Sequence, residues 1–274
     1  MTFYDIFEVG LIPTLIMGES REISVALLAV LCLLGGVAAY FLGSMNFAII
    51  ISKVKFHDDI RRYGSGNGGM TNMLRTFGKA AAAFTLLGDM AKAAVSVFIG
   101  SLLGGEAGAY IAGFFCVLGH SFPCYYGFRG GKGIVVTATM LLCLEPVVFL
   151  ILFTIFVILV ASTKYLSLGS IIGMMLYPLL LNRMYSFLNH GQPEGMVPAL
   201  ISILNAGLVI WLHRENLKRL WTGKENKFSL KKKDKFVKEE KEEKEAADAA
   251  PEETPEEAKK RRIHEEAFGE ESEK

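Results

Sequence analysis

Several apolar runs in this chain approach the length of a membrane-spanning helix. About 20 predominantly apolar residues are needed to cross the hydrocarbon core of a bilayer. Polar backbone groups have no water to bind there, so a spanning segment must satisfy them internally, as a helix does. The sequence therefore predicts an all-α, polytopic integral membrane protein. The predicted apolar runs cover about 23–53, 80–103, 107–122, 134–161, 165–182 and 196–213.

The run at 134–161 is interrupted by Glu145-Pro146. Proline directly after an acidic residue is typical of a turn, so we predict two shorter spans in this region. The total is then seven transmembrane helices. Treating 134–161 as one crossing would give six, and would place Lys164 on the side opposite the other cationic loops.

Lysine and arginine lie almost entirely on one side of these seven predicted helices. Twelve of them fall in the loops of that side, and the other side receives only Arg21 and Arg183. Positively charged loops stay in the cytoplasm. We therefore expect the N-terminus outside and the C-terminus in the cytoplasm.

Three segments differ in composition. Residues 23–228 form the predicted membrane domain, and residues 1–22 form a short amphipathic lead-in. From residue 227 onward, 13 Lys and Arg alternate with 16 Asp and Glu, with few aromatic residues. Such a composition does not bury enough apolar surface to fold, so residues 229–274 are predicted to be a disordered cytoplasmic tail. The sequence assigns no role to the lead-in or the tail.

Four polar stretches interrupt the apolar sequence, at 59–75, 119–133, 164–170 and 213–225. All four are predicted on the cytoplasmic side, which favours one shared site over four unrelated connectors. The first stretch combines four glycines, which free backbone N–H groups to face an anion, with polar side chains suited to phosphate. Taken alone, it is equally well explained as a connecting loop. The side chains suited to phosphate are Arg61, Ser65, Asn67, Asn72 and Arg75.

The sequence Gly130-Gly131-Lys132-Gly133 precedes a predicted helix and is a candidate phosphate cradle, because helix N-termini attract anions. It is not a nucleotide-binding P-loop. Tyr126 stands where that motif requires its first glycine, and Gly133 stands where it requires Ser or Thr. The alternative is that these glycines serve only close packing at a helix end.

Two histidines and two serines are candidates for chemistry. His213 is the stronger candidate for a general base, because Asn216 follows at one-turn spacing, whereas His120 is predicted to be structural. Ser65 and Ser167 have no neighbouring Ser-His-Asp relay and no Gly-x-Ser-x-Gly elbow. We therefore expect both serines to donate hydrogen bonds to substrate.

Two ionisable residues fall inside the second predicted helix. Asp89 and Lys92 are three residues apart, hence on one helix face. Ionisable groups at membrane depth are costly unless paired, so we predict a structural ion pair rather than a substrate contact. No metal site is predicted, because no cysteine has metal-ligand spacing.

In chain order, these motifs resemble the bacterial membrane glycerol-3-phosphate acyltransferase family that uses acyl phosphate as donor. The resemblance covers about residues 30–228 and implies a multi-pass protein of the cell inner (cytoplasmic) membrane with its active site facing the cytoplasm. It rests on Gly43-Ser44, Asp59-Ile60-Arg61, Gly64-Ser65-Gly66-Asn67, Thr71-Asn72 to Arg75, Gly119-His120, Gly130-Gly131-Lys132-Gly133, Ser167-Leu168-Gly169-Ser170, and His213-Arg214-Glu215-Asn216 with Gly223 and Glu225. The His-x4-Asp signature of the common glycerolipid acyltransferases is absent.

The resemblance implies a fatty acyl transfer from acyl phosphate to the 1-hydroxyl of sn-glycerol 3-phosphate. The products would be lysophosphatidic acid and phosphate, in the first step of phospholipid synthesis, without a cofactor, metal or nucleic acid. It implies that His213, Asn216 and Ser65 are catalytic and that Glu225 is structural. The substrate-binding residues it implies are Arg75, Asn72, Asn67, Gly130, Gly131, Lys132, Gly133 and Ser167. Acyl-chain preference, oligomeric state and protein partners do not follow from the sequence.

A transporter of phosphorylated metabolites is the alternative function. It would explain the same phosphate-binding groups and the same polar face. It also predicts access from both sides of the membrane, and the outer loops carry almost no cationic residues.

Overall fold

The structure is a computed structural model that describes residues 10–17, 24–188 and 195–228. The chain divides into two units, Met1–Lys232 and Lys233–Lys274, and every described residue belongs to the first. The predicted lead-in is therefore described only at 10–17, and the predicted tail lies outside the described residues.

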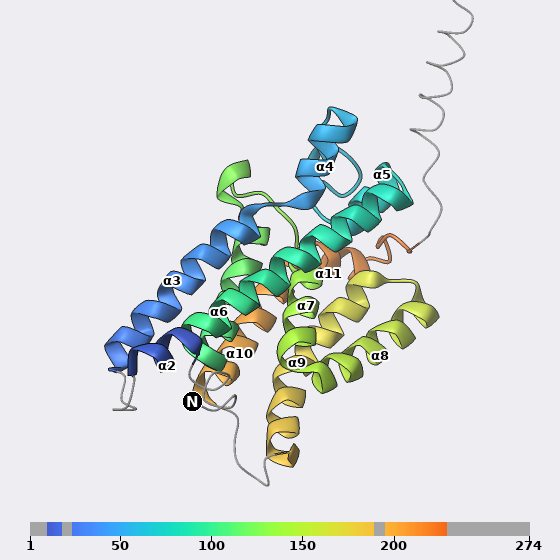
Figure 1. Cartoon of the computed structure of the whole chain (residues 1–274). Coiled ribbons are helices and arrows are strands. Elements are labelled where there is room, and N and C mark those ends of the chain that lie inside the picture. The colour runs from blue at the N-terminus through green and yellow to red at the C-terminus, as the bar shows by residue number, and fades with distance from the viewer. Residues whose placement is uncertain (1–9, 18–23, 189–194, 229–274) are drawn as a thin grey trace, which may run out of the picture. The chain divides into compact units, whose positions relative to one another are not determined.

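Every regular element of the described chain is a helix, as predicted (Figure 1). The apolar segments pack side by side, and short helices lie between them or at their ends. The elements are α2 (Leu11–Met17), α3 (Val25–Ser44), α4 (Phe47–Phe56), η1 (Ile60–Arg62), α5 (Met70–Thr76), α6 (Lys79–Ser121), η2 (Cys124–Tyr126), α7 (Ile134–Leu144), α8 (Pro146–Thr163), α9 (Leu166–Leu188), α10 (Met196–Leu212) and α11 (Arg214–Trp221).

Most predicted spans correspond to helices. The predicted turn at Glu145-Pro146 is confirmed, since α7 ends and α8 begins there. Two spans and one polar stretch differ from the prediction. The run at 23–53 is two helices rather than one, because the Asn46 side chain accepts a hydrogen bond from the Ile49 N–H (3.1 Å) and starts α4 anew. Helix α9 continues past the predicted end at 182 to Leu188, and the stretch at 59–75 is not entirely loop, since it contains η1 and most of α5.

Helix α6 reverses direction at Gly104-Gly105. Gly105 has a φ of +59° and a ψ of −143°, a conformation that a residue with a Cβ rarely adopts. The two arms then fold back on each other so closely that a Cβ on Gly100 would lie 2.3 Å from the Gly108 carbonyl oxygen. The arms therefore correspond to the two separate spans predicted at 80–103 and 107–122.

The number of membrane crossings stays a prediction. By length and composition, the described residues contain four helices able to cross a membrane, or five if α10 and α11 form one bent span. The two arms of α6 are counted together in that number. Helix α7 has 11 residues, about 16 Å of helix, against about 30 Å of hydrocarbon. Alone it is too short for a full span.

Small residues allow α3 and α6 to approach closely, as the glycines of the first predicted span suggested. A Cβ on Gly43 would lie 2.3 Å from the Cys116 carbonyl oxygen, and one on Gly119 would lie 2.2 Å from the Tyr40 carbonyl oxygen. Neither backbone can move away without separating the two helices. These two glycines are therefore required by packing.

The ion pair predicted between Asp89 and Lys92 is present, with 2.8 Å between Nζ and Oδ1. Both side chains are buried. The Lys92 ammonium also donates to the carbonyls of Gly43 (3.0 Å) and Met45 (3.0 Å), and it lies 3.0 Å from His120 Nδ1. It thus satisfies carbonyls at the break between α3 and α4.

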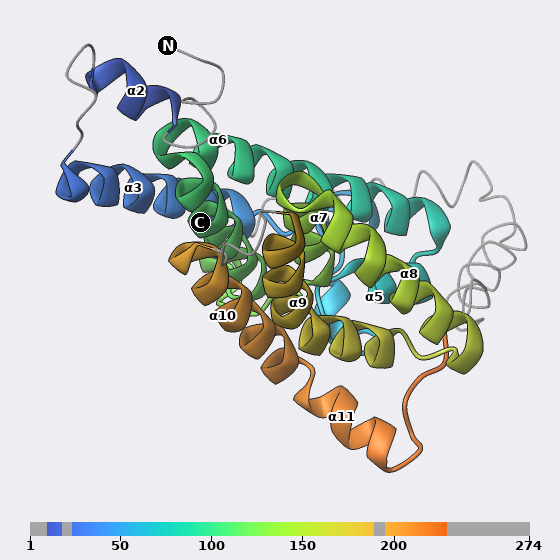
Figure 2. The same cartoon turned by 90° about the horizontal axis from the view of Figure 1, so that it is seen from below.

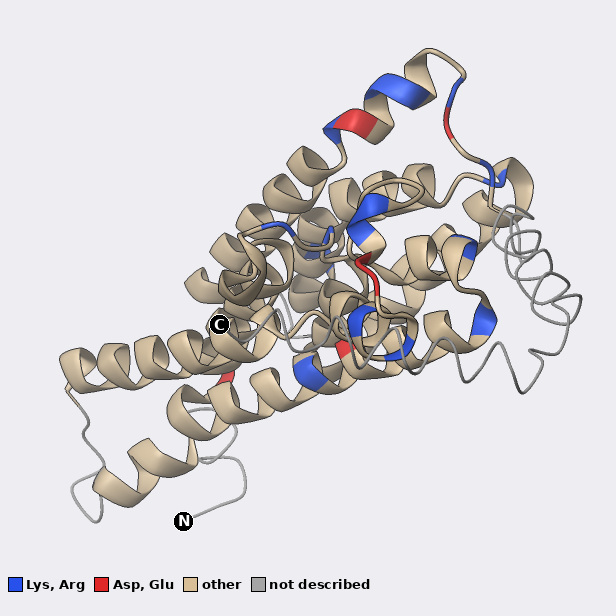
Figure 3. Ribbon diagram, turned by 90° about the horizontal axis from the view of Figure 1, so that it is seen from above, with Lys and Arg blue, Asp and Glu red and all other residues tan. Residues whose placement is uncertain are grey.

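The four polar stretches meet at one end of the helices, which we call the site end. The Gly68 N–H donates to the Gly130 carbonyl (3.1 Å), and the Phe228 N–H donates to the Lys164 carbonyl (2.6 Å). In Figure 3, most Lys and Arg segments lie away from α2 and the first part of α3. At the opposite end, the Tyr110 hydroxyl bonds to Glu145 (2.7 Å).

We predict that Gly43→Ala lowers stability by about 1–3 kcal/mol, because the new methyl group meets backbone rather than a flexible side chain. Gly207→Ala is the matched control, since a Cβ there meets no atom within 4 Å. It should be neutral or slightly stabilising. The thermal unfolding midpoints in detergent give the comparison, and equal midpoints for the two variants would contradict the packing assignment.

Candidate active site

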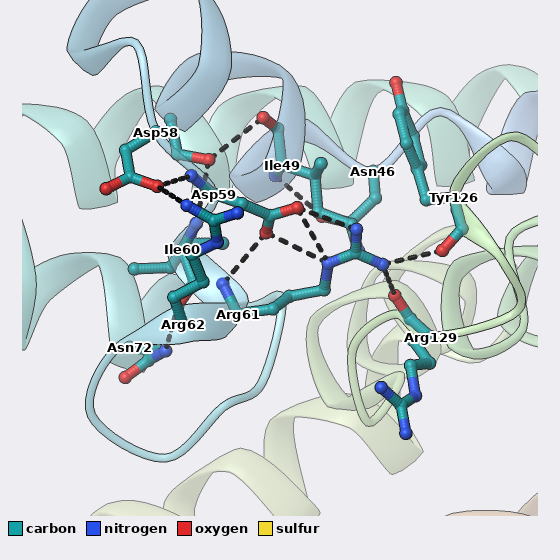
Figure 4. Close-up of polar contacts among 11 residues, drawn as sticks. Asn46, Ile49, Asp58, Asp59, Ile60, Arg61, Arg62, Asn72, Tyr126 and Arg129 are labelled. Carbon is teal, nitrogen blue, oxygen red and sulfur yellow. Dashed lines mark hydrogen bonds and ion pairs between the residues drawn. The ribbon is translucent and has the colours of Figure 1, made fainter.

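The loop before α5 is held in place by Asn72 and Arg61 (Figure 4). The buried Asn72 amide donates to the carbonyls of Ile60 (3.2 Å), Tyr63 (2.9 Å) and Asn67 (3.1 Å), and its Oδ1 accepts from the Ser65 N–H (3.1 Å). Asn72 was predicted to bind substrate. Asn72 lines the same cavity as Ser65, and its hydrogen bonds also shape the loop that carries Ser65 and Asn67.

Arg61 is likewise committed, although the sequence suggested it for phosphate. It forms an ion pair with Asp59 (2.7 Å), and its Nη1 donates to the carbonyls of Tyr126 (2.6 Å) and Arg129 (3.0 Å) (Figure 4). The guanidinium therefore ties the loop before α5 to the loop before α7, leaving little of it for a ligand.

Three predicted groups of this region line a cavity and keep free polar atoms. The side chains of Ser65, Asn67 and Arg75 form no hydrogen bond or ion pair with another residue of the described chain, and all three line the cavity. Burial lowers the pKa of the Arg75 guanidinium, yet arginine remains charged at any physiological pH. Arg75 is thus a half-buried cation that feels the charge of Glu225 but forms no direct ion pair with any described residue, which favours an anionic ligand.

Glu225 organises the other wall of the cavity. Its Oε1 accepts from Ser167 Oγ (3.0 Å) and Asn216 Nδ2 (2.8 Å), and its Oε2 accepts from Arg219 Nε (2.8 Å). Burial opposes its ionisation, but the hydrogen bonds from Asn216, Arg219 and Ser167 outweigh burial and lower its pKa. One carboxylate thus joins α9, α11 and the segment after α11.

Lys132 reaches the same network through Asn216, whose Oδ1 accepts a hydrogen bond from the lysine Nζ. Burial, together with the positive charges of Arg219 and Arg75, lowers the pKa of Lys132 to about 8, against the opposing effect of Glu225. The polar part of the cavity therefore brings Lys132, Arg75 and Arg219 near one another, with Glu225 as their nearby counter-charge.

The glycines before Lys132 have a different role from the predicted one. The N–H of Gly130 donates to the Ser121 carbonyl (3.1 Å), and that of Gly131 donates to the His120 carbonyl (3.0 Å). A Cβ on Gly131 would lie 1.9 Å from His120 Nε2. Both glycines are therefore occupied in packing against the end of α6, and neither N–H is free for phosphate. The candidate cradle narrows to Lys132, Gly133 and the first turn of α7, which line the cavity.

His213 lies at the break between α10 and α11 and is buried. Its Nδ1 lies 2.8 Å from the Val209 carbonyl oxygen, which can only accept, so Nδ1 carries the proton and Nε2 keeps the lone pair. Burial and the nearby Lys132 lower the pKa of His213 to about 4. The imidazole is neutral at physiological pH and offers Nε2 as a hydrogen-bond acceptor.

The cavity has a volume of about 550 Å³ and two chemically different parts. The polar part holds Ser65, Arg75, Lys132, His213 and Glu225. The apolar part extends between α6, α7, α8 and α9, and its lining includes Leu86, Met90, Leu141, Leu142, Phe149, Leu152, Phe153, Phe156 and Met174. Such a cavity suits a ligand with an anionic head and an apolar chain.

Arg219 was not among the predicted site residues, because helix α11 was not predicted. Asn216 and Arg219 are three residues apart and share a helix face, which was the available signal. Asp89 and His120 also line the cavity, although both were assigned structural roles.

Three comparisons with known proteins agree. A family model described as glycerol-3-phosphate acyltransferase matches residues 30–223. A glycerol-3-phosphate acyltransferase of Thermoanaerobacter sp. (strain X514) is 41% identical over 198 residues, covering 72% of this chain and 96% of that protein. One from Clostridioides difficile (strain 630) is 39% identical over 202 residues, covering 72% and 95%.

The fold is similar to two crystal structures of PlsY, an integral membrane glycerol 3-phosphate acyltransferase. The glycerol 3-phosphate form has a TM-score of 0.65 and 32% identity, covering 72% of this chain and 96% of that one. The lysophosphatidic acid form has a TM-score of 0.62 and 30% identity, covering 73% and 96%.

We predict that Glu225→Ala destabilises the protein by at least about 2 kcal/mol, because it leaves buried donors without a charged acceptor. Glu215→Ala is the matched control on α11, where the exposed carboxylate contacts only Lys218 (3.3 Å) among the described residues. It should change stability by less than about 0.5 kcal/mol. Thermal unfolding in detergent measures both, and a Glu225→Ala midpoint equal to that of Glu215→Ala would refute the organising role.

Proposed function

The chain belongs to the glycerol-3-phosphate acyltransferase family, and we propose that it transfers a fatty acyl group from acyl phosphate to the 1-hydroxyl of sn-glycerol 3-phosphate. The products are lysophosphatidic acid and inorganic phosphate. The glycerol 3-phosphate and lysophosphatidic acid forms of PlsY support the acceptor and the product. The acyl phosphate donor rests on the motif series of the sequence.

The observation that carries this proposal is the cavity with a cationic end and an apolar end. Arg75 and Lys132 lie at the polar end without a direct carboxylate partner among the described residues. The apolar end between α7, α8 and α9 suits an acyl chain. Family membership favours acyl transfer over transport of phosphorylated metabolites, the alternative that the sequence left open.

We assign substrate phosphate to Arg75, Lys132 and Ser65. Asn67, Gly133 and the first turn of α7 complete this part of the lining. Arginine binds phosphate oxygens with two parallel hydrogen bonds, and lysine adds a point charge. Holding both substrates in reacting geometry supplies much of the rate enhancement available to such an enzyme.

The reaction then forms one bond to the acyl carbon and breaks another. The 1-hydroxyl oxygen attacks the acyl carbon, the bond from that carbon to the phosphate oxygen breaks, and the phosphate leaves with the electron pair. The departing phosphate takes the hydroxyl proton, so no strong base is required. The cations near the leaving group stabilise the charge that develops there.

His213 accepts a hydrogen bond from the attacking hydroxyl through Nε2 and orients it. A group with a pKa of about 4 is a weak base at pH 7, so orientation is its main contribution. Asn216, predicted as catalytic, and Ser167, predicted to bind substrate, both bond to Glu225. We propose that these two side chains position Lys132 and the wall of the cavity.

We propose the same membrane topology that the sequence predicts. Seven crossings place the site end at the cytoplasmic face of the cell membrane, where glycerol 3-phosphate is available. Residues 23–228 form the membrane domain that contains the complete site.

We expect the purified full-length protein to form labelled lysophosphatidic acid from palmitoyl phosphate and labelled glycerol 3-phosphate without added metal or nucleotide. Arg75→Ala, made in parallel, should lose at least about a hundredfold in kcat/KM, since it removes a charged substrate contact. Absence of product, together with uptake of labelled glycerol 3-phosphate by proteoliposomes, would replace this proposal with transport.

The pH dependence tests Lys132. With a pKa of about 8, its ammonium is charged below pH 8 and neutral above, so kcat/KM for glycerol 3-phosphate should fall above pH 8. In Lys132→Arg the charge persists, and this alkaline decline should disappear. The exposed Lys164, replaced by Arg, is the control and should keep the decline. An unchanged decline in Lys132→Arg would remove Lys132 from phosphate binding; calorimetric binding across pH replaces kinetics if that variant turns over too slowly.

His213→Gln separates orientation from general-base catalysis. Glutamine keeps a hydrogen-bond acceptor but is not a base, so we expect kcat to fall by less than about tenfold. General-base catalysis contributes about 10²–10⁴ in rate, and a loss of that size in a stably folded variant would assign the proton to His213.

A further inference from the structure

Helix α11 has two functionally different faces. Asn216 is buried and Arg219 turns toward the cavity, where both side chains bond to Glu225. The opposite side of the helix carries no residue of the candidate site. That side carries Arg214, Leu217, Lys218 and Trp221.

The outer face of α11 joins exposed apolar and cationic side chains. Trp221 is 94% exposed and Leu217 is 41% exposed. Arg214 and Lys218 lie one turn apart on the neighbouring strip of the helix, also exposed. Leu217 and Trp221 are four residues apart, so they form one contiguous exposed apolar surface on α11 beside the two cations. A contiguous surface of this kind indicates an interaction site.

The position of α11 indicates what that partner is. Helix α10 is an apolar helix, and α11 follows it after a bend of 56° (Figure 2). Trp211, in the last turn of α10, is 51% exposed, and the Arg214 guanidinium lies over its ring at 4.4 Å. Tryptophans near the end of a membrane helix, followed by an amphipathic cationic helix, are typical of the membrane–water interface.

We propose that the outer face of α11 binds anionic phospholipid headgroups, and that this contact holds the active-site network in its productive geometry. Leu217 and Trp221 enter the boundary of the acyl region, and Arg214 and Lys218 contact the phosphates. Each lysine or arginine near an anionic leaflet strengthens the binding of the segment that carries it to that leaflet. The apolar strip beside these cations fits a lipid surface better than an acidic peptide.

The functional consequence follows from the two faces sharing one rigid helix. Asn216 and Arg219 are fixed to the same backbone as the outer face, and Asn216 accepts the hydrogen bond of Lys132. A helix held at the headgroup layer therefore keeps Glu225, Asn216 and Lys132 in register. This coupling between lipid and active site rests on the proposed function, whereas lipid binding itself does not.

Fluorescence tests lipid binding in the full chain. The chain contains two tryptophans, so Trp211→Phe leaves Trp221 as the only reporter. Vesicles contain phosphatidylcholine and phosphatidylglycerol at one fixed ratio, with bromine on the acyl chains of one lipid or the other. We expect stronger quenching by brominated phosphatidylglycerol. Two interfacial cations favour the anionic lipid by about thirtyfold, so Arg214→Gln/Lys218→Gln should abolish the preference.

Lys55→Gln/Arg129→Gln is the matched control. It removes the same charge from exposed cations of the site end that lie outside α11, and it should keep the preference. Equal quenching by both lipids in the parent protein, or no quenching by either, would overturn the binding surface. Loss of the preference in the control as well would assign it to general surface charge and overturn the specific role of α11.

Activity tests the coupling. The rate of lysophosphatidic acid formation should rise severalfold as phosphatidylglycerol replaces phosphatidylcholine, and this rise should vanish in Arg214→Gln/Lys218→Gln. A variant that keeps the rise, or that is equally impaired in detergent without anionic lipid, would overturn the activation. If the parent protein makes no product in any vesicle, the acyl-transfer proposal fails, and the quenching still decides whether α11 binds lipid.

Discussion

The ammonium group of Lys92 connects the helices that carry the site. It neutralises Asp89, contacts His120 and caps the carbonyls of Gly43 and Met45 at the break between α3 and α4. A buried charge without such partners would be costly. The His120 carbonyl in turn accepts the Gly131 N–H, so the loop before α7 rests on this cluster. The breaks needed for a polar site are thereby stabilised inside an apolar bundle.

Close packing and ligand binding compete for the same backbone at the site end. The glycines before Lys132 allow that loop to contact the end of α6, and this contact uses their N–H groups. In the proposed site, phosphate is therefore held mainly by side chains, with Arg75 and Lys132 supplied by different elements. The hydrogen bonds of Asn72 and Arg61 fix the loops that surround the cavity. A rigid arrangement of this kind is preorganised, so little reorganisation is needed when substrate binds.

Much of the arrangement could be predicted from the sequence. Apolar length identified the long helices, Glu145-Pro146 marked a turn, and loop charge grouped the polar stretches that meet at the site end. Individual contacts between side chains were harder to predict from the sequence. The Lys132–Asn216 and Ser167–Glu225 pairs join residues that are 84 and 58 positions apart, and no local pattern encodes them. The eight-residue α11 is too short and polar for an apolar-run criterion, which is why Arg219 was missed.

The amide of Asn216 stands between Lys132 and Glu225 and has a consequence for turnover. A direct ion pair would leave the lysine charge neutralised before substrate arrives. The interposed amide transmits a hydrogen bond but little charge, so the lysine remains available to an anion. The proposed acyl transfer releases inorganic phosphate in every cycle, so the same lysine would meet both the incoming and the departing phosphate. Its affinity for that anion would then set how fast the product leaves, because tight product binding makes release the slow step.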